Sequence, residues 1–251
     1  MKSHKKHKLS ITKTSAILMS AIMLMLAFGN GFAQSVQPMI FELEPSGSKS
    51  SESLRIENPN SGPMTVEIVP LKIIIDEHGK ETNVLAEDDF LIYPPQTIIQ
   101  ANSVQAVKVK YIGDPSIEVS QAYRISVNQL PVDLNSDGSG VSILTKFLTI
   151  ANVSPVKSRP NLKVTNIAES DDEKWLVTIE NTGNRFGSLS STSWELESHD
   201  QLITSKTLSI NEVNQFVHQT LVPPKSKLLI SLPSVEGFKA ALTTIKLVKE
   251  S

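Results

Sequence analysis

Histidine and carboxylate side chains, which could bind a metal or move a proton, come together at only a few places in this sequence. His78 follows two acidic residues and precedes Gly79, and His199 lies beside Asp200. A metal site or an acid–base pair needs several such groups to converge, and neither histidine has partners at a suitable spacing. Both lie among turn-forming residues, so we expect solvated turns at these positions.

Other chemistries lack their sequence signals. The acidic runs at residues 87–89 and 171–173 do not alternate as the ligands of a calcium loop do. The absence of cysteine excludes thiol catalysis and cysteine-based metal sites. No phosphate-binding glycine loop, nucleophile elbow or zinc-protease helix motif occurs. The sequence therefore predicts a protein that is not an enzyme and that needs no metal or cofactor.

The N-terminal segment predicts export. A lysine-rich start precedes the apolar residues 16–28, and Gly31 and Ala33 fit the small-residue positions of a signal-peptidase site. The apolar run is shorter than the roughly 20 residues of a transmembrane helix, although a retained anchor is the alternative. Removing residues 1–33 takes away five lysines and no acidic residue, which changes the formal net charge from −2 to −7. This charge argues against nucleic acid or an anionic membrane as a partner, and we expect no stable membrane insertion.

The rest of the chain predicts an all-β fold without a helix of any length. Short runs rich in Val, Ile, Leu and Thr alternate between two faces and are separated by turn residues. In residues 104–111, for example, Val107, Val109 and Tyr111 share one face. The first strand is expected at residues 35–43, with Pro38 pushing it toward a sheet edge.

The chain divides into two predicted units. About seven strands precede the proline-containing linker at residues 155–160, which is enough for one sandwich domain over residues 34–154. Residues 161–251 form the second unit. Its candidate strands are residues 162–167, 174–180, 192–197, 201–210, 215–221, 228–232 and 241–248.

The apolar strand in residues 140–155 has the strongest functional signal. It is rich in β-branched residues, and its one cation is Lys146. Alternation places Val141, Ile143 and Phe147 on one face, and Lys146 and Leu148 on the other. A soluble protein rarely leaves such an edge exposed, so the strand is either buried in a sheet or reserved for a partner.

Four segments, in this order, resemble the periplasmic pilus-assembly chaperones of the PapD-like family. They are residues 90–115, with Pro94 and Pro95 after an apolar strand; residues 122–131, ending in Leu130-Pro131; the strand and linker of residues 140–160; and residues 179–184 with 221–227. The resemblance implies two immunoglobulin-like β-sandwich domains joined by a short linker, with a cleft between them. It implies capture of pilus subunits in the periplasm by donor-strand complementation, in which the chaperone lends an edge strand to the subunit. It also implies delivery to an outer-membrane usher.

The resemblance also implies roles for residues of the lending strand. Val141, Ile143 and Phe147 would be the donor residues, and Lys146 would bind the C-terminal carboxylate of the subunit from within the cleft. Two features depart from the family pattern: Lys146 lies further from Pro155 than the family's cation, and residues 34–44 contain no Lys or Arg. Another cation could complete the site, with Arg124, Lys157 and Arg159 as candidates, or strand pairing alone could hold the subunit.

Two other functions remain as alternatives. A structural or adhesive surface protein, such as a pilus subunit, would be built from similar strands, but a subunit should be a single incomplete sandwich with a free N-terminal extension. A secreted hydrolase is disfavoured because no catalytic motif occurs.

Overall fold

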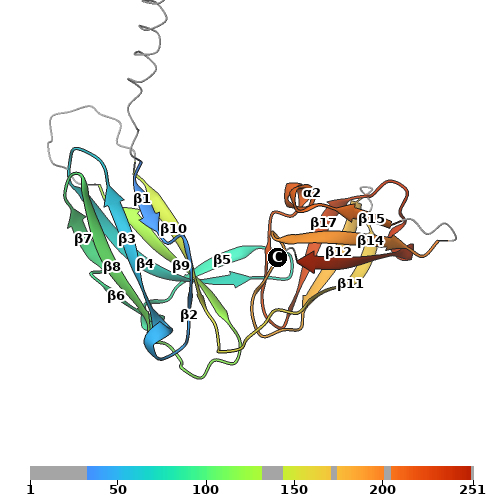
Figure 1. The fold of residues 1–251 in the computed structure, drawn as a ribbon, viewed down its shortest axis with the longest axis horizontal. Helices are drawn as coiled ribbons and strands as arrows, with labels where there is room; N and C mark the ends of the chain where they lie inside the picture. Colours follow the sequence, from blue (N-terminus) through green and yellow to red (C-terminus); the bar gives the residue numbers. More distant parts are fainter. Residues whose placement is uncertain (1–32, 132–143, 171–173, 201–204, 250–251) are drawn as a thin grey trace, which may run out of the picture. The chain divides into compact units, whose positions relative to one another are not determined.

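The chain builds two hydrophobic cores from β-strands (Figure 1). The structure is a computed structural model that describes residues 33–131, 144–170, 174–200 and 205–249. Ser35–Ser251 form one compact unit. One core is built from residues between Val36 and Val153, and the other from residues between Trp175 and Ile245. This all-β, two-sandwich architecture confirms the predicted fold class.

The first sandwich consists of two sheets. Its strands are β1 (Ser35–Gln37), β2 (Ile40–Leu43), β3 (Ser51–Asn58), β4 (Met64–Ile75), β5 (Glu81–Leu85), β6 (Phe90–Tyr93), β7 (Gln96–Ile99), β8 (Ser103–Tyr111), β9 (Gln121–Gln129) and β10 (Lys146–Val153). One sheet has the order β1-β3-β8-β6. The other has the order β2-β10-β9-β4-β5, with β7 also paired to β4.

Side-chain alternation fixes which face of each strand enters this core. In β8, Val107, Val109 and Tyr111 are buried, whereas Lys108 and Lys110 are exposed. The predicted alternation of this strand is therefore confirmed. An apolar face of this kind stabilises a sheet by roughly 25 cal/mol for each Å² removed from water.

The predicted single strand at residues 35–43 is two strands in different sheets. β1 pairs antiparallel with β3, whereas β2 pairs parallel with β10. Pro38 lies between β1 and β2, and proline has no N–H for a continuous ladder. The chain therefore leaves one sheet at this proline and joins the other.

The second sandwich packs around Trp175 and Trp194, which are both almost fully buried. Its sheets have the orders β11-β12-β17 and β15-β14-β18, and β13 pairs with β16. The strands are β11 (Leu162–Glu169), β12 (Lys174–Asn181), β13 (Gly187–Ser188), β14 (Thr192–Ser198), β15 (Ser205–Leu208), β16 (Leu221–Val222), β17 (Ser226–Pro233) and β18 (Thr243–Lys249).

A short helix corrects the prediction that no helix would follow the N-terminal segment. Helix α2 (Ile210–Phe216) fills the gap between the predicted strands of residues 201–210 and 215–221, and it overlaps one end of each. The Ser209 side chain accepts a hydrogen bond from the Glu212 N–H, and the Glu212 carboxylate accepts one from the Ser209 N–H. This capping box favours a helix locally, and it outweighs the strand propensity of the following apolar residues.

Each sandwich contains one fully buried asparagine at the end of a strand. Asn58 donates from Nδ2 to the carbonyl oxygens of Gly62, Ile99 and Gln100. Asn181 donates in the same way to two carbonyl oxygens in its own sandwich and accepts from two backbone N–H groups. Each asparagine is the last residue of an Ile-Glu-Asn tripeptide. The two sandwiches therefore use the same type of side-chain contact to close a loop.

Candidate functional site

β10 has an open edge over its first half. It pairs with β9 along its whole length, but with β2 only from Ile150 onward. The Ile150 N–H donates to the Met39 carbonyl oxygen at 2.8 Å. Because main-chain groups alternate along a strand, those of Lys146 and Leu148 point to the same side, where no described strand pairs with them.

Apolar side chains surround this open edge. Leu148 is 38% exposed and Leu144 47%, and Ile40, at the end of β2, is 65% exposed. Phe147 faces the other way: it is half-buried and packs against the first core. Phe147 was predicted as a donor residue, and in this structure the pleat directs its side chain toward its own sandwich. Val141 and Ile143 lie outside the described residues.

Lys146 is exposed on the same face as Leu148. Within the part of the chain that the structure describes, no ion pair involves it. It does not line the pocket between the sandwiches, which β10 reaches only at Asn152. Six residues of strand separate the two positions, a distance of roughly 20 Å at about 3.3 Å per residue. The resemblance had implied that Lys146 acts from within the cleft. In this structure, Lys146 lies outside the pocket between the sandwiches.

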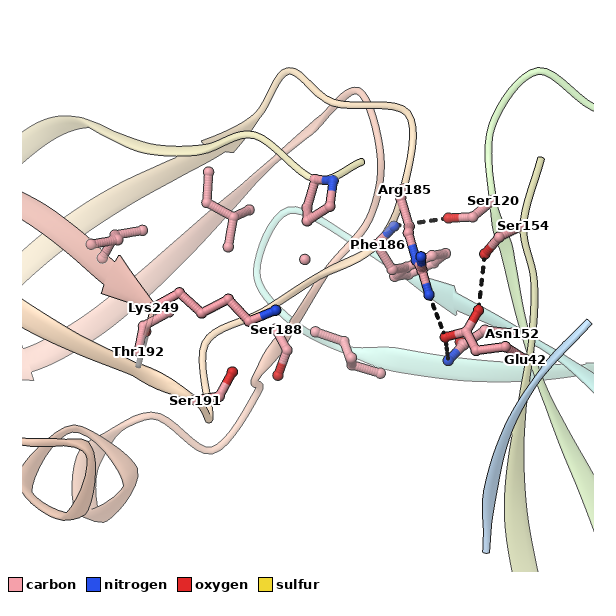
Figure 2. A pocket seen from close by; sticks show the side chains of 15 residues that line it. Glu42, Ser120, Asn152, Ser154, Arg185, Phe186, Ser188, Ser191, Thr192 and Lys249 are labelled. Atoms are coloured by element: carbon pink, nitrogen blue, oxygen red, sulfur yellow. Dashed lines mark hydrogen bonds and ion pairs between the residues drawn. The ribbon is translucent and has the colours of Figure 1, made fainter. Parts of the chain in front are cut away.

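A pocket of about 440 Å³ is lined by residues of both sandwiches (Figure 2). Glu42 of β2 is its central charged group on the first sandwich. Its carboxylate pairs with Arg185 at 2.8 Å and accepts hydrogen bonds from Asn152 and Ser154, each at 3.2 Å. Nearby, the Phe186 N–H donates to the Ser120 hydroxyl at 2.8 Å. These contacts join the first sandwich to the loop that follows β12.

The cations of this pocket were not predicted from the sequence. Arg185 and Lys249 both line it, and the Lys249 side chain extends along the pocket in Figure 2. Neither residue belongs to an apolar strand with a single cation, which was the signal that singled out Lys146. Lys157 and Arg159, the candidates near the linker, are exposed and do not line this pocket.

Arg124 is already paired with a carboxylate. Its Nε and one terminal nitrogen each donate to a different carboxylate oxygen of Glu81 at 2.7 Å. Both side chains are about one-fifth exposed. The hydrogen bond from Arg124 lowers the pKa of Glu81 below its usual value. A partner carboxylate would have to displace Glu81, so the structure does not offer Arg124 as a free anchor.

This pair gives an expected pH dependence. The pKa of Glu81 is lower in the folded chain, so the pair stabilises the fold above the ordinary pKa of 4.5 and loses this contribution as the pH falls through the folded value. We expect Arg124→Met to lower the melting temperature at pH 7, and this difference should shrink as the pH falls from about 5 toward about 1. Thermal melts of both proteins across this range measure the difference. A gap that stayed constant down to acid pH would contradict the role of the ion pair.

Two further features are absent from the described residues. No group of three or more metal-ligating side chains was found there. No helix among residues 33–249, outside the undescribed gaps, is long and apolar enough to cross a membrane.

Solved structures with the same fold include fimbrial chaperones. The class 5 fimbriae chaperone CfaA superposes with a TM-score of 0.57 at 15% identity, covering 87% of this chain and 100% of that one. A chain from the chaperone–tip adhesin complex of CFA/I fimbriae gives a TM-score of 0.56 at 15% identity, covering 88% and 100%. The CsuC–CsuE chaperone–adhesion subunit complex of Acinetobacter baumannii gives 0.56 at 13% identity, covering 87% and 98%.

Sequence comparison alone finds no relative: no family model matches this chain, and no curated protein matches it. The three structures above are described as chaperones or chaperone complexes, and none is described as an enzyme. The strands, their order along the chain and the two cores thus give this protein the same fold as these fimbrial chaperones.

Proposed function

We propose that this protein is a periplasmic chaperone that holds pilus subunits by lending them the edge of β10. The observation that carries this proposal is the open first half of β10, bordered by exposed Leu148 and Ile40. An open, apolar edge is a liability unless a partner pairs with it. A partner strand would gain main-chain hydrogen bonds from the edge and side-chain contacts from the exposed face.

The fold supports the identity of the partner. Proteins with this fold have been solved with a tip adhesin subunit and with a pilin. By analogy, the partner is a pilus subunit whose sheet lacks a strand, and an outer-membrane usher receives the complex. The division into a signal peptide of residues 1–33, domains 34–154 and 161–251, and a linker of residues 155–160 is part of this proposal, as is export to the periplasm.

The donor residues are reassigned within this proposal. The side chains that face outward from the described part of β10 are Lys146, Leu148 and Ile150, and Leu144 precedes them. We therefore take Leu144 and Leu148 as the apolar donor residues in place of Phe147. Val141 and Ile143 lie outside the described part; regular alternation places them on the face of Phe147, so their proposed donor role requires a bulge before Leu144.

Lys146 remains the proposed anchor for a subunit carboxylate, since it is exposed at the open edge and has no ion-pair partner there. A charge-assisted hydrogen bond of this kind contributes about 1.5–3 kcal/mol. Arg185 is the competing cation, although Glu42 occupies it in this structure.

The test is capture of a co-exported pilus subunit by purified tagged chaperone. Lys146→Ala should lower the yield of complex by about tenfold, which is the effect of roughly 1.4 kcal/mol, while its melting temperature stays unchanged. Arg185→Ala, the matched loss of a cation, should leave capture at the wild-type level. If Arg185→Ala lost the subunit and Lys146→Ala did not, the anchor would lie in the pocket instead. If the wild type captured no subunit, the proposed function itself would fail.

The adhesive alternative has no comparable support. It is favoured by the β-sandwich composition alone, and it leaves the open edge of β10 unexplained.

A further inference from the structure

A second open edge lies on β5, the last strand of its sheet. All five residues of β5 are at least partly exposed, and Val84 and Leu85 are 46% and 57% exposed. Ile74, on the neighbouring β4, is 51% exposed. Natural sheets usually protect such an edge with lysine, proline or a bulge. β5 contains no lysine or proline, and its pairing with β4 runs without a register shift.

The hydrogen bonds of the β4–β5 hairpin show which groups are free. The Asp76 N–H donates to the Lys80 carbonyl oxygen, and the Ala86 N–H donates to that of Pro70. Lys80 and Ala86 therefore turn their main chain toward β4. By alternation, the main-chain groups of Thr82 and Val84 also point toward β4. The open side therefore receives the N–H and C=O groups of Glu81, Asn83 and Leu85.

The hairpin is held in place at its turn end. Near its tip, the Leu229 N–H donates to the Glu77 carbonyl oxygen at 2.8 Å, and Gln219 Nε2 donates to that of Gly79 at 3.3 Å. Gly79 has a φ of +78°, and a Cβ there would come within 3.2 Å of Gln219. Near the start of β5, Glu81 is bound by Arg124. A strand held in this way loses little conformational freedom on binding.

We propose that β5 pairs antiparallel with β5 of a second copy of this chain. The edge is complementary to itself, because its central residue, Asn83, is one of those that face outward. Centred there, Asn83 lies opposite Asn83 of the second copy and Glu81 lies opposite Leu85, and these pairs exchange about six main-chain hydrogen bonds.

The charges along β5 also favour a second copy of this chain as the partner. The one charged residue of the strand, Glu81, is neutralised by Arg124, so self-pairing brings together no uncompensated like charges. Just beyond the strand, Lys80 of one copy lies opposite Ala86 and beside Glu87 of the other. The exposed Val84 side chain lies opposite Thr82, on the face that also carries Ile74. The open edge of β10 is less suited to self-pairing, because pairing there would bring two uncompensated Lys146 charges together.

Sedimentation velocity of the mature chain alone, at ~5 to ~500 µM, tests the proposal. The weight-average mass should rise toward that of a dimer with concentration. Asn83→Pro removes only an outward-facing N–H, and it should weaken dimerisation by at least about tenfold. The matched variant Asn83→Ala keeps the N–H and should dimerise like the wild type. If circular dichroism shows that Asn83→Pro disturbs the fold, Val84→Lys replaces it.

Cross-linking gives an independent readout because the chain contains no cysteine. Asn83→Cys should form a disulfide-linked dimer on mild oxidation, since opposed residues in such a pair lie about 5.5 Å apart between Cα atoms. Lys146→Cys should not. A chain that stays monomeric throughout, or an Asn83→Pro variant that dimerises unchanged, overturns the proposal. Loss of the dimer in Leu148→Pro but not in Asn83→Pro also overturns it, because the interface would then be β10.

Discussion

Leu148→Pro is expected to abolish capture of a pilus subunit, lowering the affinity by at least about a hundredfold. The Leu148 N–H points to the open side of β10, so proline removes a donor from the edge that the subunit would use. Its ring would also block close approach of a partner strand. The pairing of β10 with β9 does not depend on this N–H, because the groups that face β9 belong to the alternate residues.

The matched variant for this experiment is Leu148→Ala. It keeps the main-chain donor and loses only part of the exposed side chain, so capture should fall by about tenfold or less. Pull-down of a co-exported subunit measures both variants, and thermal melts verify that they are folded. Equal capture by Leu148→Pro and Leu148→Ala would mean that main-chain pairing at this edge does not hold the subunit.

Asn58→Ala is expected to destabilise the first sandwich by about 3 kcal/mol. The change removes the donor from three carbonyl oxygens, one of them in a buried contact and two in part-buried contacts, and each unsatisfied buried group costs about 1–3 kcal/mol unless water replaces the donor. Asn181→Ala should have a similar effect on the second sandwich. Urea unfolding at 25 °C, with the slope compared to the wild type, gives the free-energy difference.

The control for this measurement is Asn60→Ala. Asn60 is exposed, and it donates to Asn58 only through its backbone N–H, which alanine retains. Its effect should stay within about 0.5 kcal/mol. A loss below about 1 kcal/mol in Asn58→Ala would show that the loops are held by other contacts, and the shared role of the two asparagines would have to be abandoned.

The fold could be predicted from the sequence wherever burial on one face decides the structure. β8 alternates as expected because one of its faces enters the core. The prediction failed where a local contact competes with that pattern. Pro38 divides the first strand between two sheets, and the capping box of Ser209 and Glu212 starts α2 between two predicted strands.

The site could be predicted only in part. The apolar strand with Lys146 was identified, because an apolar strand with a single cation is a local signal. Which face of β10 is exposed depends on its pairing with β9 and β2, so the sequence alone does not show that Phe147 packs against its own core. Arg185 and Glu42 are 143 positions apart in the sequence, and only the tertiary structure brings their charges within 2.8 Å.

Amide hydrogen exchange tests the central claim most directly. The protein would be compared alone and in complex with a co-exported pilus subunit, with exchange resolved at individual residues of β10. Pairing at the open edge predicts that the amides of Lys146 and Leu148 become strongly protected in the complex, while that of Ile150, already bonded to Met39, changes little. A stable complex in which Lys146 and Leu148 exchange as fast as in the free protein would contradict the claim that β10 is the strand lent to the subunit.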